Sequence, residues 1–86
     1  MTVTVRLFGA LRERAPARDA TEMVGILELD ERSVVNVDGV LGVVGVSEED
    51  TGHLILNGEY VKGSTPVSDG DTLSVFPKNM AIKWLM

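Results

Sequence analysis

Residues 36–46, NVDGVLGVVGV, decide the fold, because they can be read either as a strand or as a helix. Valine and glycine are poor helix formers, so propensity alone predicts a strand. The larger apolar residues nevertheless recur at the spacing of one helical face: Val37, Val40, Leu41 and Val44. Asn36 stands where an N-cap is expected, and Gly45 is placed to end the helix in a left-handed conformation. We therefore predict a short helix over residues 37–44, stabilised by packing and not by propensity.

Segments with strand character precede this helix. Residues 2–8 alternate strictly between apolar and polar or aromatic side chains, which predicts a strand packed on one side. Residues 22–29 resume strand character, and Gly25 within them predicts a bulge or a bend. The arginine-rich segment between them, residues 10–20, is expected to be a loop or a short helical turn over residues 11–15.

Two turn signals follow the helix. Asn57-Gly58 lies between the apolar runs 53–56 and 59–61 and predicts a hairpin, because a type I′ turn needs positive φ at both central residues. Residues 66–71 form a second turn cluster, in which Gly70 supplies positive φ. A last alternating strand covers residues 72–76 and is stopped by proline.

The order of elements is therefore strand, strand, helix, two hairpin strands and a final strand. One helix packed on one face of a mixed sheet buries all of these apolar stripes together. We predict an α+β protein with a ubiquitin-like β-grasp fold, in which one short helix crosses one face of a four- to five-stranded mixed sheet. Residues 1–78 are expected to form this domain, and residues 79–86 an apolar C-terminal tail.

Composition excludes several classes of function. The 86 residues allow one domain, and the absence of cysteine excludes disulfides, thiolate metal sites and cysteine nucleophiles. A net charge of −5 argues against a nucleic-acid partner, and no apolar stretch is long enough to span a membrane. No nucleophile–base pair or paired-carboxylate site is evident, so we expect a non-enzymatic protein of the cytoplasm, with no cofactor and no metal.

Three segments together resemble a known family. Residues 5–13 (VRLFGALRE) are similar to the opening strand and loop of the small sulfur-carrier proteins of the MoaD/ThiS type, which include the molybdopterin synthase small subunit and the thiamine-biosynthesis carrier. Residues 55–61 (ILNGEYV) are similar to the central hairpin of these carriers, and residues 65–77 (TPVSDGDTLSVFP) to their last turn and strand. The resemblance implies a ubiquitin-like β-grasp fold and a larger protein partner, either an activating enzyme or a synthase or oxidoreductase subunit.

The resemblance also implies a chemistry at the end of the chain. In the family, an activating enzyme adenylates a terminal glycine carboxylate with ATP, and sulfur then replaces AMP to give a thiocarboxylate. Two terminal glycines suit an extended passage into the enzyme because they have no Cβ. This sequence contains no adjacent pair of glycines, and its last glycine is Gly70. We therefore expect an atypical member of the family without the C-terminal Gly-Gly.

The candidate partner-binding residues are aromatic or apolar and fall near the end of the first strand, at the end of the last strand and in the tail: Phe8, Phe76, Pro77, Met80, Ile82, Trp84 and Leu85. If the first and last strands are neighbours, Phe8 and Phe76 emerge on the sheet face opposite the helix, either as an exposed contact surface or beneath Trp84. The tail either docks into a groove of the partner or folds back over the sheet. Oligomeric state is left open.

Two other features have weaker functional interpretations. Arg12, Arg14 and Arg18 either bind an acidic partner or a phosphate, or belong to a solvated loop. His53 has no companion at metal-ligand spacing and is expected to be an ordinary residue at the start of the hairpin.

Three functions remain open from the sequence. The first is a non-catalytic, sulfur-carrier-like module that binds a larger partner through its sheet face and tail. The second is a genuine sulfur carrier or small synthase subunit for molybdenum or tungsten cofactor, thiamine or thiolation. The third, which rests on fold analogy, is an accessory subunit of a metal-pterin oxidoreductase or a nuclease.

Overall fold

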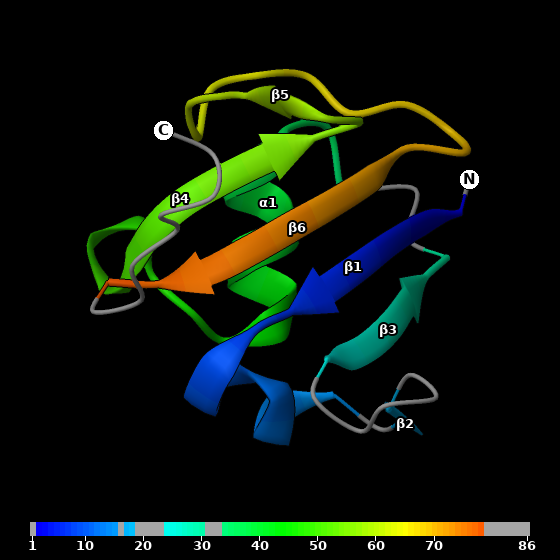
Figure 1. Cartoon of the computed structure of the whole chain (residues 1–86). Coiled ribbons are helices and arrows are strands. Elements are labelled where there is room, and N and C mark those ends of the chain that lie inside the picture. The colour runs from blue at the N-terminus through cyan, green and yellow to red at the C-terminus, as the bar shows by residue number, and fades with distance from the viewer. Residues whose placement is uncertain (1, 16, 19–23, 31–33, 79–86) are drawn as a thin grey trace.

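The structure is a computed structural model, and it describes residues 2–15, 17–18, 24–30 and 34–78. Within these residues one α-helix lies across one face of a mixed sheet, as Figure 1 shows. The strands follow one another in space in the order β2-β3-β1-β6-β4-β5. Their bounds are β1 (Val3–Leu7), β2 (Ala17–Arg18), β3 (Gly25–Leu29), β4 (Thr51–Leu56), β5 (Glu59–Tyr60) and β6 (Thr72–Pro77). The predicted β-grasp arrangement is confirmed.

The sheet is mixed because its two central strands, β1 and β6, run parallel. Every other pairing is antiparallel: β1 with β3, β2 with β3, β4 with β6 and β4 with β5. The first and last strands of the described chain are therefore neighbours, as the topology predicted. This adjacency brings the ends of β1 and β6 to the same edge of the molecule.

The helix α1 spans Val37–Val44, the bounds predicted from the apolar spacing. The side chain of Asn36 accepts a hydrogen bond of 2.9 Å from the Gly39 backbone N–H and so caps the first turn. Gly45 ends the helix at a φ of 89°, and its N–H donates to the carbonyl of Leu41. These two ends allow a helix of poor intrinsic propensity to form where its apolar face meets the sheet.

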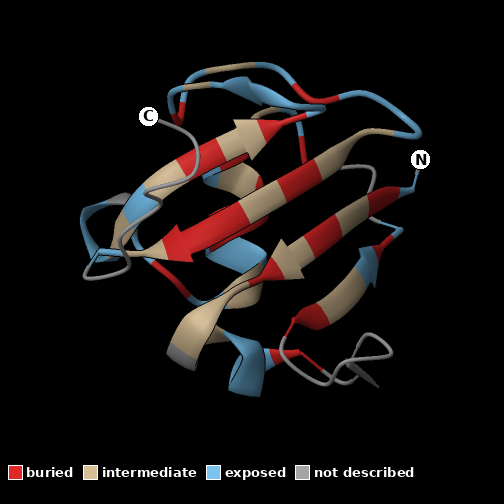
Figure 2. Ribbon diagram, in the orientation of Figure 1, coloured by how far each residue is buried: buried red, intermediate tan, exposed pale blue. Residues whose placement is uncertain are grey.

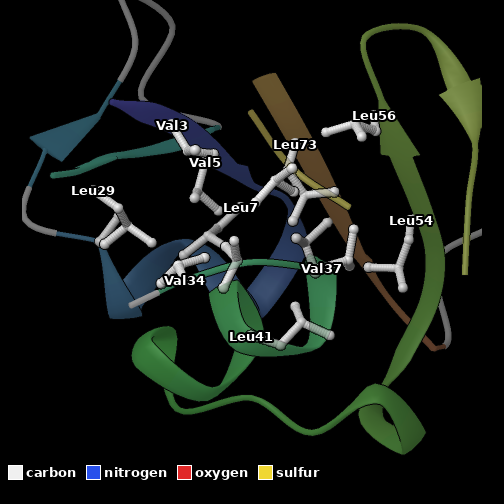
Figure 3. Packing of buried hydrophobic residues seen from close by; sticks show 14 residues of the cluster. Val3, Val5, Leu7, Leu29, Val34, Val37, Leu41, Leu54, Leu56 and Leu73 are labelled. Carbon is white, nitrogen blue, oxygen red and sulfur yellow. The ribbon is translucent and has the colours of Figure 1, made fainter. Parts of the chain in front are cut away.

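Side chains from α1 and from the facing side of the sheet form the hydrophobic core (Figure 3). Val5, Leu7, Leu73 and Val75 on the two central strands have no exposed surface. Buried and half-buried residues alternate along β1 and along most of β6 (Figure 2). The residues of this cluster are all aliphatic. The core is thus built from the alternate positions that the sequence pattern indicated.

Both predicted turns have the expected backbone. Asn57 and Gly58 have φ values of 52° and 88°, as a type I′ hairpin between β4 and β5 requires. Gly70 has a φ of 88° in the turn that precedes β6. These conformations confirm the two turn signals.

Two local predictions were incomplete. The segment after β1 forms a 3₁₀-helix over Gly9–Arg14, followed by the two-residue strand β2, which gives the described sheet one strand more than predicted. Of the bulge or bend predicted around Gly25, the structure has a bend, at Val24, and no bulge, since β3 pairs with β1 in regular register from Gly25 to Leu29. A Cβ at Gly25 would lie 2.7 Å from the carbonyl oxygen of Arg12, so glycine is needed there for close backbone approach.

Candidate partner-binding face

The sheet surface that faces away from α1 is called the open face here. Its residues alternate with the buried ones along each strand: Thr4 and Arg6 on β1, Ser74 and Phe76 on β6, and His53 and Ile55 on β4. Residues paired across two strands point to the same side of a sheet. Arg6 pairs with Ser74, Ser74 with Ile55, and Ile55 with Tyr60. The open face is therefore continuous from β1 to β5.

Phe8 and Phe76 form a stacked pair on this face. Leu7 of β1 is opposite Val75 of β6, and the Phe8 N–H donates to the Val75 carbonyl, so the two residues that follow lie side by side. Their ring centroids are 4.2 Å apart, and the ring planes differ by 15°. The parallel pairing of β1 with β6 therefore explains the stack directly.

The sequence left open whether the two rings are exposed or covered, and the answer differs between them. Only 6% of the surface of Phe76 is exposed, whereas Phe8 is half-buried. One side of Phe76 stacks on Phe8, and the ring of His53 approaches it edge-on at 6.1 Å. Phe76 thus lies between Phe8 and His53, and Phe8 has more of its surface exposed than Phe76.

Further side chains extend this pair into a row across four strands. His53 lies between Phe76 and Tyr60, with its ring 5.7 Å from that of Tyr60 at an angle of 64°. At the other end, the Cζ atom of Arg6 lies 5.5 Å from the centroid of Phe8, within cation–π distance. We call Arg6, Phe8, Phe76, His53 and Tyr60 the aromatic row. Tyr60 is its most accessible ring, with 60% of its surface exposed.

The sequence pattern placed Arg6 on the same side of its strand as Phe8, because the two residues are two positions apart, but Arg6 was not among the candidate binding residues. Sequence reasoning missed His53 and Tyr60 as members of this face. The place of His53 was not detectable, because a register shift between Thr51 and His53 decides that it lies opposite Phe76. The histidine expected to be unremarkable is therefore the link between the two ends of the row.

The arginines of the 3₁₀-helix lie outside the row. The Arg12 Nη1 donates to the carbonyl of Gly9 at 3.1 Å. A Cβ at Gly45 would lie 3.3 Å from the Arg14 Nη1, which places this cation beside the C-terminus of α1, where the helix dipole favours positive charge. The backbone of Arg18 pairs with Gly25 in the sheet. Local structure accounts for the positions of Arg12 and Arg14.

The predicted tail contacts fall outside the described residues: Met80, Ile82, Trp84 and Leu85. Pro77, the remaining candidate, closes β6 opposite Thr51. The division into a domain over 1–78 and a tail over 79–86 therefore stays a prediction.

The described residues offer surfaces for contact and no evident centre for chemistry. No group of three or more His, Asp or Glu side chains among them is arranged to hold a metal ion. Their buried residues include no polar or charged side chain. None of their helices is long and apolar enough to cross a membrane. Stacking and apolar contact at the aromatic row are what this arrangement can provide.

A family model described as the ThiS family matches residues 5–78, which include β6, most of β1 and the whole aromatic row. The chain belongs to the ThiS family. A search of curated protein sequences returns no match. Membership and fold together make this ThiS-family chain a sulfur-carrier-like, ubiquitin-like protein.

Solved structures share the fold of this ThiS-family chain. Small archaeal modifier protein 1 of Haloferax volcanii is 19% identical with a TM-score of 0.66, over 88% of this chain and 95% of that one. A putative molybdopterin converting factor subunit 1 from Pyrococcus furiosus is 20% identical with a TM-score of 0.64, over 90% and 97%. A third match is a chain of the complex between subunits 1 and 2 of the molybdopterin-converting factor of Helicobacter pylori. It is 22% identical with a TM-score of 0.59, over 94% of this chain and 99% of that one. At these identities the likeness shows the fold alone.

Proposed function

We propose that this ThiS-family chain is a non-catalytic module that binds a larger protein through its open face. One observation carries the proposal. All three aromatic residues of the described chain, Phe8, Tyr60 and Phe76, lie on the open face, while the core cluster is entirely aliphatic. Aromatic residues are enriched at the centres of protein interfaces, where they anchor binding.

The shape of the row indicates how such a partner is bound. Phe76 is held from two sides by Phe8 and His53, so the ring platform is rigid before binding. A pre-organised platform costs less side-chain entropy on binding than a mobile one. Phe8 and Tyr60 are the accessible rings at either side of this platform, and we assign them the main contacts.

The class of partner is proposed from the relatives. The Helicobacter pylori structure is described as a protein–protein complex of two molybdopterin-converting factor subunits. By analogy, the partner of this chain is an activating enzyme or a synthase or oxidoreductase subunit. In the predicted arrangement, Pro77 marks where the chain leaves the open face, and residues 79–86 add a second contact on the same partner.

Capture of the partner tests the proposal. The chain is immobilised, an extract of its source organism is passed over it, and retained proteins are identified by mass spectrometry and then purified for calorimetry. We expect Phe8→Ala and Tyr60→Ala to weaken the purified complex at least about tenfold, the cost of losing an interface anchor. Val43→Ala, on the exposed side of α1, is the matched control and should leave the affinity unchanged. Equal affinity of all three variants would overturn the proposal.

Family membership supports a second candidate, a genuine sulfur carrier. The two candidates differ in covalent chemistry, because only a carrier exchanges a carboxylate oxygen for sulfur. The full chain is incubated with ATP, sulfide and an activating enzyme of the family, and its intact mass is measured. A sulfur-for-oxygen exchange at the C-terminal carboxylate would establish the carrier; an unchanged mass together with Phe8-dependent binding would support the binding module. A cytoplasmic location stays a prediction from the sequence.

A further inference from the structure

Asn57 joins the hairpin turn to the turn that precedes β6. Its side-chain Nδ2 donates to Asp71 Oδ1 at 2.9 Å, and its Oδ1 accepts from the Thr72 N–H at 2.9 Å. Its backbone N–H donates to the Thr72 carbonyl, also at 2.9 Å. We call Asn57, Asp71 and Thr72 the turn clasp. Both functional groups of the asparagine amide are thereby fixed, although the residue is exposed.

The turn clasp is anchored in the rest of the fold. The second carboxylate oxygen of Asp71 accepts from the Ser68 N–H at 2.7 Å, so both of its oxygens are occupied. The same turn holds the start of the chain, since the Thr2 N–H donates to Asp69 Oδ1 and the Gly70 N–H donates to the Thr2 carbonyl. Any change to the Asn57 amide is therefore transmitted to a turn that joins β1, β4 and β6.

Asn57 is also followed by Gly58, the successor that least hinders attack on an asparagine side chain because it has no Cβ. We infer that Asn57 is a site of spontaneous deamidation that the turn clasp protects in the folded protein. In the reaction the Gly58 backbone nitrogen loses its proton and bonds to Cγ of Asn57. The Cγ–Nδ2 bond then breaks and ammonia leaves with that proton. Water opens the resulting succinimide to aspartate or isoaspartate, so no oxidant or other co-reactant is needed.

The clasp opposes this step because the reacting group is the one it holds. Attack on Cγ requires the amide to rotate away from Asp71 and Thr72 and to lose both hydrogen bonds. Opening the hairpin end removes this restraint, and local opening of a turn is less costly than global unfolding. We therefore assign the reaction to the opened hairpin or the unfolded chain.

The product would not fit the site that the asparagine leaves. Aspartate at 57 retains an acceptor for the Thr72 N–H but replaces the Nδ2 donor with an oxygen facing Asp71 Oδ1. Two carboxylates at hydrogen-bond distance repel each other, and neither can donate while both are ionised. Deamidation therefore converts the clasp from attractive to repulsive and loosens the join between the two turns.

The reaction is measured by peptide mapping after incubation in mildly alkaline buffer, with and without urea. We expect deamidation at Asn57 to be several-fold faster in urea than in the folded chain. Asp71→Ala should raise the rate in the folded chain several-fold, once circular dichroism has shown that the variant is folded. Asn36, followed by the β-branched Val37, is an internal reference and should react more slowly in urea. Equal rates at Asn57 in the folded and unfolded chains would overturn the inference.

A second set of variants tests the repulsion without relying on the reaction. Asn57→Asp should unfold at lower urea concentration than the starting chain. Ser64→Asp, which adds the same charge at an exposed position of the loop after β5, should unfold with little change. Adding Asp71→Asn to Asn57→Asp exchanges the donor and the acceptor across the clasp. The double variant should therefore unfold at a urea concentration close to that of the starting chain. An Asn57→Asp variant as stable as the Ser64→Asp control would contradict the geometry on which the inference rests.

Discussion

The two faces of the sheet carry different chemistry on the same strands. On β1, Val5 and Leu7 are fully buried against the aliphatic core, while Arg6 and, just after the strand, Phe8 belong to the aromatic row. On β6, Val75 likewise belongs to the aliphatic core and Phe76 to the aromatic row, and both are buried. The core depends on burial and shape alone, whereas the open face depends on particular rings and one cation. A substitution on the first face should thus change stability, and one on the second should change recognition.

The largest expected effect on the core is that of Leu41→Ala. Leu41 is 1% exposed in the middle of α1, and truncating a buried leucine leaves a cavity that costs about 2–5 kcal/mol of unfolding free energy. Urea denaturation followed by circular dichroism measures this loss. Val43 lies on the outer side of the same helix and is 48% exposed. Val43→Ala should therefore change the free energy of unfolding by less than about 0.5 kcal/mol. A similar loss for both variants would mean that the side of α1 facing the sheet and the exposed side contribute equally to stability.

Removal of the cap at the start of α1 should reduce stability less than Leu41→Ala does. Asn36→Ala loses the acceptor for the Gly39 N–H and should reduce the unfolding free energy by about 0.5–2 kcal/mol. Asn36→Asp keeps a cap acceptor and is the control, because aspartate caps as well as asparagine. If Asn36→Ala proved neutral, the helix would owe its start to packing and not to its cap.

The stacked phenylalanines offer the corresponding measurement on the open face. A double-mutant cycle compares the free energies of unfolding of Phe8→Ala, Phe76→Ala and the double variant. We expect a coupling free energy of about 0.5–1.5 kcal/mol, the range measured for aromatic pairs. Phe8→Ala with Leu73→Ala is the control cycle. These two residues lie on opposite faces of the sheet, so their coupling should be smaller. A Phe8–Phe76 coupling near zero would indicate that the rings are independent, and the row would then not be a rigid platform.

Much of the core face was predictable because its signals are local. The spacing of Val37, Val40 and Leu41, together with Asn36 and Gly45 at the ends, predicted the bounds of α1 against the propensity of its residues. Asn57-Gly58 likewise required positive φ at both positions, and the structure has it. In each case the physical cause lies within a few residues of its effect.

The open face was harder to predict because its contacts depend on pairing between distant strands. Phe8 and Phe76 were placed together correctly from the expected topology, but the edge-on contact of His53 with Phe76 was not predicted. That contact depends on the irregularity between Thr51 and His53, where Gly52 lies so close to the end of β6 that a Cβ would be 2.7 Å from the Pro77 carbonyl oxygen. A register shift of this kind leaves no periodic trace in the sequence. The same holds for β2, whose two residues form a strand only because β3 is beside them.

The smallest expected effect is a gain in stability on the outer side of α1. A Cβ built at Gly42 would meet no atom within 4 Å, and glycine within a helix costs roughly 0.5–1 kcal/mol relative to alanine. Gly42→Ala should therefore raise the unfolding free energy by about that amount, measured by thermal and urea denaturation. Gly45→Ala is the opposing control, because its φ of 89° is strained for alanine and its Cβ would crowd Arg14, so this variant should be less stable. Since Gly42 faces away from the sheet, the gain should leave partner affinity at the open face unchanged. A loss of affinity in Gly42→Ala would show instead that the partner also contacts the helix, and the division between the two faces would then fail.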